Sequence, residues 1–376
     1  MYIEERHRKD GIKYRYCEKF YDPRYNKWRR KSVTFNNKTR ETRKRAQEML
    51  TNAIQKELGN VVMDSRTIHS VIEEYKKIYK KNVKRTTFLS VETQYQEFEE
   101  FIDSNRIITT ITTQDLNRFF DYLLYTRNIS NSTTSAYKSR LNKLFQYAVK
   151  NGYIETNPIE GCIIEYKART ESKKNPNKFL EDDEYNRLIE YTRKINLRYA
   201  MFFEWMYMTG MRVGEALALT WDKIDLDSNP PVAHVSSTLE YKKLKIKDVY
   251  ASTSPKTTAS IRSVSLPNRC IEILAQIEEL EGENRGFIFT TSKHTPISIH
   301  ALNTFLRVHR ERMGIDKNIS THIFRHTHIS KLAEMGLPLY SIQARVGHEN
   351  SQVTESIYLH ITKKMKDEVY SAIQNM

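Results

Sequence analysis

The sequence predicts a multidomain protein of the α+β class. With 376 residues, the chain is longer than a single ordinary core supports, so two or three domains are expected. The spacing of apolar residues also changes along the chain, from every second residue, to every third or fourth, to a mixture of both. We therefore expect a small three-stranded sheet with a helix in residues 1–65, an all-α domain in 66–166, a linker in 167–178, and a mixed, mainly α domain in 179–376.

The first domain is predicted from alternating residues. One run alternates apolar with basic side chains, as a strand with one buried and one basic face does. Its apolar members are Ile12, Tyr14, Tyr16 and Phe20. A second strand is expected near 27–35, after a turn that contains Asp, Pro and Asn. A helix from about Thr39 to Leu58 should follow, with an apolar side made of Ala46, Met49, Leu50, Ala53 and Ile54.

The charge of this domain points to a polyanionic partner. Residues 1–65 contain 17 Lys and Arg against 9 Asp and Glu, a net charge of +8 out of +15 for the whole chain. Such an excess favours nucleic acid, and double-stranded DNA is the first candidate, although a solvated basic face remains an alternative. The candidate DNA contacts are four basic residues of the two strands: Lys13, Arg15, Lys19 and Arg29.

The second domain is predicted by three apolar stripes at helical spacing, which we expect to form its core. They are Ile68, Val71, Ile72, Tyr75, Ile78 and Tyr79; Leu116, Phe119, Phe120, Leu123 and Leu124; and Tyr137, Leu141, Leu144, Phe145 and Ala148. The segment 167–178 is polar and basic, which is typical of a linker. Beyond it we expect helices near 181–208 and 213–220, short strands near 232–265, and further helices to the end.

Five short motifs in the last domain carry side chains suited to phosphodiester chemistry. They are Arg212 in TGMRVGE, Lys256 in SPKTTASIRSV, His322 and Arg325 in HIFRHT, His348 in VGHEN, and Tyr358 in SIYLHIT. Two arginines can neutralise the phosphate oxygens with planar, permanently charged forks. A tyrosine can attack the phosphorus and store the bond energy in an ester, while Lys or His transfers protons.

Several other classes of site and protein are disfavoured. No glycine-rich phosphate loop and no carboxylate cluster for two-metal chemistry occurs, so we expect neither cofactor nor metal. A zinc site built from histidines is weakened by the lack of HExxH and of nearby cysteines; its members would be His322, His326, His328 and His348. No run of 18 apolar residues exists, so no membrane partner is expected. The charged first twenty residues and three scattered cysteines favour the cytoplasm.

Simpler explanations of the motifs stay open. Arg212 and Glu215 could form an ordinary surface ion pair one helical turn apart. Lys256 lies near a lysine-rich stretch, and Tyr358 is one of 23 tyrosines. Only the order and spacing of all the motifs together favour a shared site.

This ordered set resembles the active site of the tyrosine recombinases, the phage integrase family. The resemblance covers residues 66–376 and is strongest in the last domain. It implies that Tyr358 is the nucleophile, which forms a 3′-phosphotyrosyl bond and frees a 5′-hydroxyl. It also implies that Arg212 and Arg325 clamp the scissile phosphate.

The resemblance further implies roles for the remaining motif residues. Lys256 would protonate the leaving oxygen, His322 would assist proton transfer near the tyrosine, and His348 would donate a hydrogen bond to a phosphate oxygen. Glu215 would orient its neighbours without reacting.

The basic first domain resembles the arm-type DNA-binding domain of integrases from phages and conjugative transposons. The family then implies a core-binding domain in 66–166, core-type and arm-type attachment sites, a homotetramer, and a Holliday junction intermediate. An excisionase and a host DNA-bending protein are implied partners. A C-terminal stripe would pack either within the chain or on a neighbouring protomer: Ile361, Met365, Val369 and Ile373. A DNA-binding regulator without catalysis and a type IB topoisomerase remain alternatives.

Overall fold

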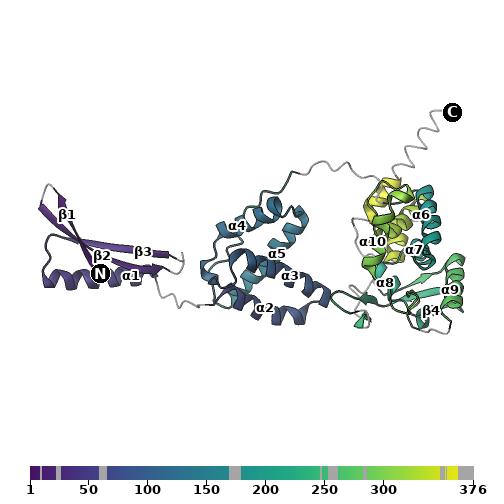
Figure 1. Cartoon of the computed structure of the whole chain (residues 1–376), viewed down its shortest axis with the longest axis horizontal. Helices are drawn as coiled ribbons and strands as arrows, with labels where there is room; N and C mark the ends of the chain where they lie inside the picture. The colour runs from purple at the N-terminus through teal and green to yellow at the C-terminus, as the bar shows by residue number, and fades with distance from the viewer. Residues whose placement is uncertain are drawn as a thin grey trace, which may run out of the picture. The chain divides into compact units, whose positions relative to one another are not determined.

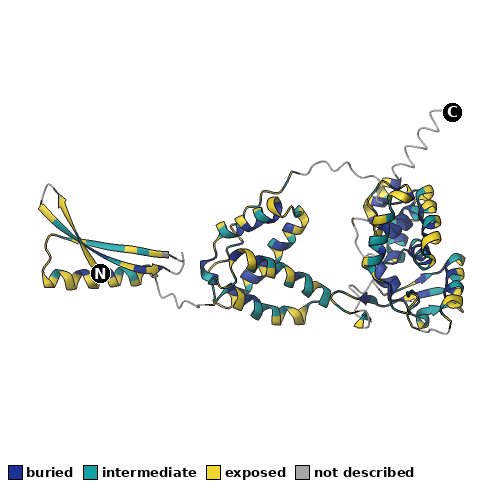
Figure 2. Ribbon diagram, viewed as in Figure 1, coloured by how far each residue is buried: buried dark blue, intermediate teal, exposed yellow. Residues whose placement is uncertain are grey.

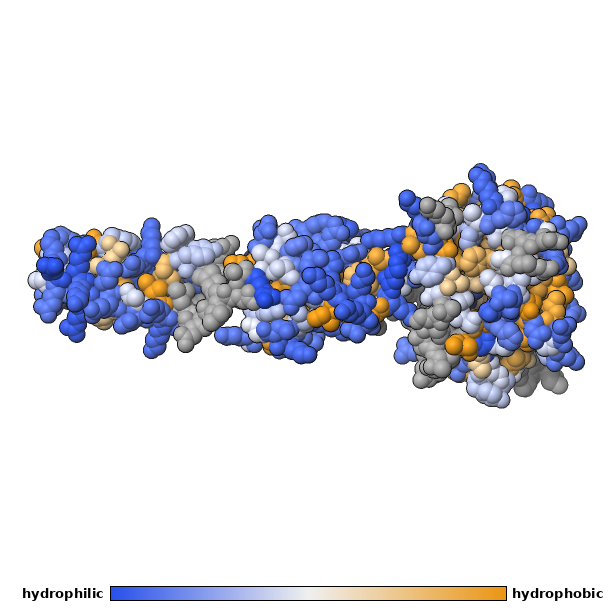
Figure 3. Space-filling model, turned by 90° about the horizontal axis from the view of Figure 1, so that it is seen from below, coloured by the Kyte–Doolittle hydropathy of each residue, from blue (hydrophilic) through white to orange (hydrophobic). Residues whose placement is uncertain are grey.

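The computed structural model divides the chain into two compact units, Met1–Arg169 and Thr170–Met376 (Figure 1). It describes residues 1–8, 11–22, 27–58, 66–168, 179–245, 248–252, 261–282, 286–347, 352 and 354–362. Among these residues, no helix is both long and apolar enough to cross a bilayer. On the face shown in Figure 3, hydrophilic side chains dominate the surface of the first unit.

The first unit begins with an antiparallel sheet covered by one helix. Its elements are β1 (Tyr2–Arg8), β2 (Gly11–Asp22), β3 (Lys27–Phe35) and α1 (Arg40–Leu58), and the strand order is β1-β2-β3. Tyr16 of β2 pairs with Ile3 and Val33 on either side and packs on Ala46 and Leu50 of α1. The predicted three-stranded sheet with a helix is therefore confirmed.

The rest of the first unit is helical. Its elements are α2 (Ile68–Asn82), α3 (Arg85–Ile102), η1 (Ile108–Thr110), α4 (Thr113–Asp121), the π-helical turn η2 (Tyr122–Thr126) and α5 (Asn131–Lys150). Thr67, Thr112 and Ser130 cap α2, α4 and α5, because each side-chain oxygen accepts a backbone N–H of the first turn. Buried residues of the predicted stripes form one core (Figure 2).

A few predicted apolar positions lie outside the cores. Ile12, Met49 and Ile78 are 43%, 46% and 46% exposed. Each belongs to a predicted apolar run whose other members include core residues, but none of the three belongs to a core itself. The buried side of each element is therefore narrower than its apolar pattern. Single exposed apolar residues of this kind are common on protein surfaces.

The second unit combines helices with two small antiparallel sheets. Its helices are α6 (Asp182–Ile195), α7 (Leu197–Thr209), α8 (Val213–Leu217), η3 (Trp221–Lys223), α9 (Asn268–Glu281), α10 (Ile299–His309), η6 (Glu311–Met313), α11 (His322–Glu334) and α12 (Leu339–Val346). Its strands are β4 (Ile224–Asp225), β5 (Val232–Val235), β6 (Thr238–Glu240), β7 (Tyr250–Ser252) and β8 (Arg262–Ser265). The sheets have the orders β4-β5-β8 and β6-β7. This mixed, mainly α unit agrees with the prediction.

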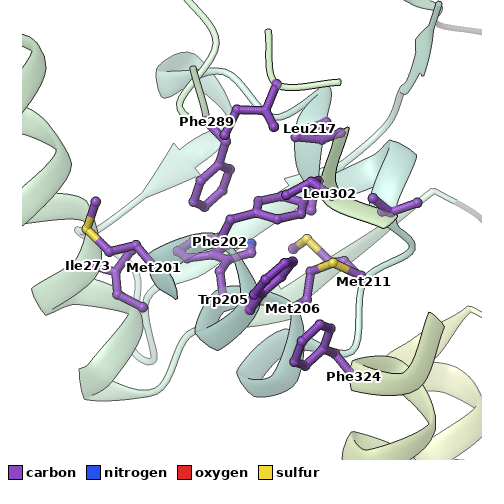
Figure 4. Packing of buried hydrophobic residues seen from close by; sticks show 14 of the residues in the cluster. Met201, Phe202, Trp205, Met206, Met211, Leu217, Ile273, Phe289, Leu302 and Phe324 are labelled. Carbon is purple, nitrogen blue, oxygen red and sulfur yellow. The ribbon is translucent and has the colours of Figure 1, made fainter. Parts of the chain in front are cut away.

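Helix α7 runs through the core of this unit. The ring centroid of Phe289 lies 5.0 Å from that of Phe202 and 5.4 Å from that of Trp205 (Figure 4). On another side, Phe203 stacks on Phe324 of α11 at 4.8 Å. Because α7 is buried nearly all round, its C-terminal end is held firmly where α11 and α8 meet it.

The helical stretch predicted near 181–208 consists of two helices, α6 and α7. Asn196 has extended backbone angles and separates α6 from α7. Its side-chain oxygen accepts the N–H of Tyr199 at 3.2 Å, which makes it the N-cap of α7. An asparagine inside an apolar helical pattern therefore marks a break, because its short side chain competes for backbone groups.

Candidate active site

Arg325 is the most buried of the candidate residues that the structure describes. It projects from the first turn of α11 and is only 3% exposed. Its guanidinium donates to the carbonyl of Gly210 and to that of Val346, each at 2.6 Å. These carbonyls lie at the C-terminal ends of α7 and α12, so one side chain joins three helices.

Burial and neighbouring positive charge act on this guanidinium. Burial lowers the pKa of Arg325 to about 9, and the charges of Arg212 and Arg262 act in the same direction. Glu215 opposes them. Arg325 stays charged at neutral pH, and a dianionic or monoanionic ligand beside it would relieve the repulsion among these arginines.

Arg212 lies at the turn between α7 and α8. Its Nη1 donates to Oε1 of Glu215 at 2.7 Å, and Oε2 of Glu215 accepts the backbone N–H of Arg212 at 2.9 Å. The surface-pair explanation is incomplete, because Nη2 also donates to the carbonyl of Gly347 at 3.1 Å. The side chain remains 34% exposed, so its guanidinium is accessible from solvent while Glu215 beneath it is buried.

The two arginines therefore converge on one short stretch of backbone. Arg325 binds the carbonyl of Val346, and Arg212 binds that of Gly347. Gly347 has a left-handed conformation and ends α12. His348 follows immediately in the chain but lies outside the described residues, as does Lys256.

His322 and His328 differ in their surroundings although both belong to α11. His322 is exposed at the first residue of the helix; partial shielding from water lowers its pKa, and the charges of Arg325 and Arg212 lower it further. His328 is buried, and burial lowers its pKa to about 3. Its Nε2 lies 3.1 Å from Nε of Arg345, whose N–H it accepts. Within the described part of the chain, no three His, Cys, Asp or Glu side chains form a group suited to a metal.

Tyr358 is carried by a helical segment over 354–362. Ile357 and Ile361 of this segment are buried against Ile329 of α11 and Ile342 of α12, and half-buried Tyr358 packs on the same cluster. The start of the predicted C-terminal stripe thus packs within the chain. Its other members, Met365, Val369 and Ile373, lie outside the described residues.

Two arginines of this region were not among the sequence candidates. Arg262, the first residue of β8, donates to Glu215 and to the carbonyl of Arg345. Arg345 in turn donates to Oγ of Ser265 at 2.7 Å and to the carbonyl of Met208 at 3.2 Å. Arg262 belongs to the SIRSV motif that follows Lys256 in the sequence, and this motif could have marked it as a candidate. Nothing in the sequence around Arg345 marks it.

The comparisons with known proteins agree with this arrangement. A model of the phage integrase family matches residues 178–365, and one of the phage integrase SAM-like domain matches residues 67–168. The "Prophage ps2 probable integrase" of Lactococcus lactis subsp. lactis (strain IL1403) is 32% identical over 95% of this chain and 96% of its own length. The chain belongs to the phage integrase family. It is therefore a tyrosine recombinase, an enzyme that cuts and rejoins DNA in a site-specific manner.

Solved integrase structures share the fold of this family member. The Tn1549 transposon integrase in complex with transposon right-end DNA has a TM-score of 0.65 at 17% identity and covers 81% of this chain and 100% of that one. The lambda integrase tetramer bound to a Holliday junction has a TM-score of 0.59 at 17% identity and covers 94% of each chain.

The sheet of this integrase-family chain separates the four basic candidates of the first domain. Lys13, Arg15 and Lys19 alternate with Tyr14 and Tyr16, which pack towards α1, so the three basic residues belong to the face that α1 does not cover. Arg29 pairs in register with buried Phe20 and lies on the opposite face. Its Nη1 is 2.9 Å from a carboxylate oxygen of Asp22 and 2.9 Å from one of Glu57 in α1.

Proposed function

We propose that this chain is an integrase that inserts a mobile genetic element into DNA and excises it again. Its strand exchange would proceed through a 3′-phosphotyrosyl intermediate and a Holliday junction. The observation that carries the proposal is the convergence of Arg212 and Arg325 on the carbonyls of Gly347 and Val346, directly before His348. Family membership supports the same chemistry.

In the proposed reaction, the phenolic oxygen of Tyr358 attacks the scissile phosphorus, and neutral His322 accepts the phenolic proton. The bond from phosphorus to the 5′ oxygen breaks, the phosphate stays on Tyr358 as a 3′ ester, and Lys256 gives a proton to the departing oxygen. A 5′-hydroxyl from the second site reverses the step and rejoins the strands. No energy source beyond the DNA is needed, because the ester retains the energy of the original bond.

The arginines would stabilise the charge that develops on the phosphate. Both offer several N–H donors in one plane, and the fixed carbonyls hold these planes before substrate arrives, so little reorganisation is required. His348 would donate a further hydrogen bond to a phosphate oxygen, and His322 would transfer protons near Tyr358. Glu215 would orient Arg212.

We propose a separate role for each of four segments of the chain. Residues 1–65 would bind arm-type DNA through Lys13, Arg15 and Lys19, residues 66–166 would bind core-type DNA, 167–178 would link the units, and 179–376 would perform catalysis. The matches to the SAM-like domain at 67–168 and to the family at 178–365 support this division. We leave Arg29 out of the proposed DNA face because two carboxylates engage it.

The proposed assembly is a homotetramer on two DNA sites, acting in the bacterial cytoplasm. The lambda integrase tetramer on a Holliday junction supports it by analogy of fold. An excisionase and a host DNA-bending protein are proposed as further partners, since arm and core sites can be bridged only by bent DNA. Neither a metal nor a cofactor enters the proposed reaction.

Covalent trapping tests the enzymatic core of this proposal. A "suicide duplex" would be built from the DNA that flanks the gene and nicked so that the freed 5′-hydroxyl fragment diffuses away. Wild-type protein should form a protein-DNA adduct, and Tyr358→Phe should not. Binding without any adduct would favour a regulator without catalysis, and relaxation of plasmids without site dependence would favour a type IB topoisomerase.

A further inference from the structure

We infer that Arg262 is a positioning residue of the recombinase site, which holds Glu215 and the backbone before His348 in the arrangement that Arg212 and Arg325 need. The inference rests on the proposed function. Arg262 acts through these groups and is not itself assigned to the phosphate.

Three consecutive carbonyls at the end of α12 accept hydrogen bonds from three different arginines. Nε of Arg262 donates to the carbonyl of Arg345 at 2.8 Å. The next two carbonyls, those of Val346 and Gly347, bind Arg325 at 2.6 Å and Arg212 at 3.1 Å. Arginines from three separate segments therefore fix the backbone that leads into His348. Only Arg212 and Arg325 were candidates from the sequence.

Arg262 also shares the carboxylate of Glu215 with Arg212. Its Nη2 donates to Oε2 at 2.9 Å, whereas Nη1 of Arg212 donates to Oε1 at 2.7 Å. Burial alone would raise the pKa of Glu215, but the pKa is lowered, by Arg262 first and by Arg212 second. Glu215 is thus a full negative charge in a site where an anionic phosphate must bind.

This sharing decides how much positive charge Arg212 retains for substrate. With both guanidiniums present, two positive charges face one carboxylate, and a net positive charge remains. Without Arg262, the whole negative charge of buried Glu215 would act on Arg212 and repel the phosphate. The side chain of Arg262 is only 8% exposed, so its interaction with Glu215 is weakly screened by solvent.

Arg262 also fixes the start of a strand. It begins β8, which pairs with β5 through the register Val235 to Arg262. Anchoring Arg262 to Glu215 of α8 and to the carbonyl of Arg345 in α12 therefore fixes the start of this strand.

The test measures covalent adduct formation and DNA affinity separately, with full-length protein and the suicide duplex. We expect Arg262→Ala to slow adduct formation roughly tenfold to hundredfold under saturating protein, because a hydrogen bond to a buried charge is lost. The Kd for the same duplex should change by less than about threefold, since Arg262 makes no proposed DNA contact. Arg262→Lys, which keeps the charge opposite Glu215, should lose less rate.

A second substitution separates charge balance from mere support of the fold. If Arg262 offsets Glu215, the double variant Arg262→Ala with Glu215→Gln should form adduct faster than Arg262→Ala alone. A structural role predicts the opposite, because another polar contact is disturbed. Arg269→Lys is the matched control: Arg269 of α9 also bridges two groups, Glu204 and Glu272, and its substitution should leave the rate unchanged.

The outcomes distinguish the two proposals. No adduct with wild-type protein would refute the proposed function, and the role of Arg262 with it. An adduct with wild-type protein and an equal rate with Arg262→Ala would refute only the role of Arg262, as would slowing without any recovery in the double variant. Should Arg262→Ala fail to fold, Arg262→Gln decides, because it removes the charge but can still donate a hydrogen bond: a folded protein with the wild-type rate overturns the inference.

Discussion

At the scale of single residues, the candidate site depends on which protein groups each guanidinium binds. Arg325 donates to carbonyls from two helix ends, and only a planar fork satisfies both at once. An ammonium group has its three donors on one nitrogen, so it cannot offer the two separate, coplanar donor nitrogens that these carbonyls bind. At position 325 an arginine can therefore be held in a fixed orientation by both carbonyls, whereas a lysine would supply the positive charge without that orientation.

Replacement of Arg325 by Lys tests this preorganisation. We expect adduct formation to fall about a hundredfold or more, because at least one carbonyl and one phosphate contact are lost together. The measurement is the single-turnover rate on the suicide duplex. Arg187→Lys is the control, since Arg187 also donates to two carbonyls, those of Met313 and Gly314, outside the site. Similar losses in both variants would contradict the assignment.

The lowered pKa of His322 predicts the pH dependence of cleavage. A lowered pKa keeps the imidazole neutral at pH 7, and it becomes protonated only as the pH falls below its ordinary value of 6.5. If neutral His322 accepts a proton during attack, the adduct rate should decline on the acid side of pH 6.5. His322→Gln should show a lower and flatter profile there. An unchanged acid limb in this variant would exclude His322 from proton transfer.

At the scale of elements, the turn between α7 and α8 positions both arginines. Gly210 ends α7 with φ of 65°, offers its carbonyl to Arg325, and is followed closely by Arg212. A Cβ at Gly210 would lie 2.4 Å from Cδ2 of His328. Both the backbone angle and the close approach of buried His328 require glycine here.

Gly210→Ala should therefore be more damaging than an ordinary glycine substitution. We expect the free energy of unfolding to fall by roughly 2–4 kcal/mol, from left-handed strain and overpacking together. Gly336→Ala is the control, because Gly336 has φ of 78° but nothing within 4 Å of its Cβ position. It should lose only about 1 kcal/mol of strain energy. Urea unfolding followed by tryptophan fluorescence measures both, and equal losses would contradict the steric argument.

At the scale of the whole molecule, basic charge and the candidate catalytic groups occupy different parts of the chain. More than half of the net charge lies in residues 1–65, whereas Arg212 and Arg325 belong to the second unit. DNA affinity and DNA cleavage should therefore be separable by substitution.

The triple variant Lys13→Ala, Arg15→Ala and Lys19→Ala tests this separation. Each lost phosphate contact should lower the slope of log affinity against log salt by about 0.9, while the rate on the suicide duplex at saturating protein should not change. Arg29→Ala should behave differently. It removes a counter-charge from Asp22, whose side chain is 0% exposed, so it should reduce stability and leave the salt slope unchanged. A lowered salt slope in Arg29→Ala would return this residue to the DNA face.

The sequence by itself predicted a succession of domains and the candidate members of the site. Periodicity marks helices and strands because one side of each must be buried, and charged motifs in a fixed order mark chemistry that few folds share. The sequence analysis did not predict the break at Asn196, because apolar spacing does not reveal side-chain capping. It did not predict the orientation of Arg29 either, because that depends on the register between β2 and β3.

Only the tertiary structure decided how the arginines are held. The partners of Arg212, Arg262 and Arg325 at the end of α12 are carbonyls, and every residue has one. Such acceptors leave no signature in a sequence, and those bound by Arg212 and Arg262 lie 135 and 83 residues away along the chain. Their convergence follows from the packing of α7, α8, β8, α11 and α12 around one point, which no local pattern encodes.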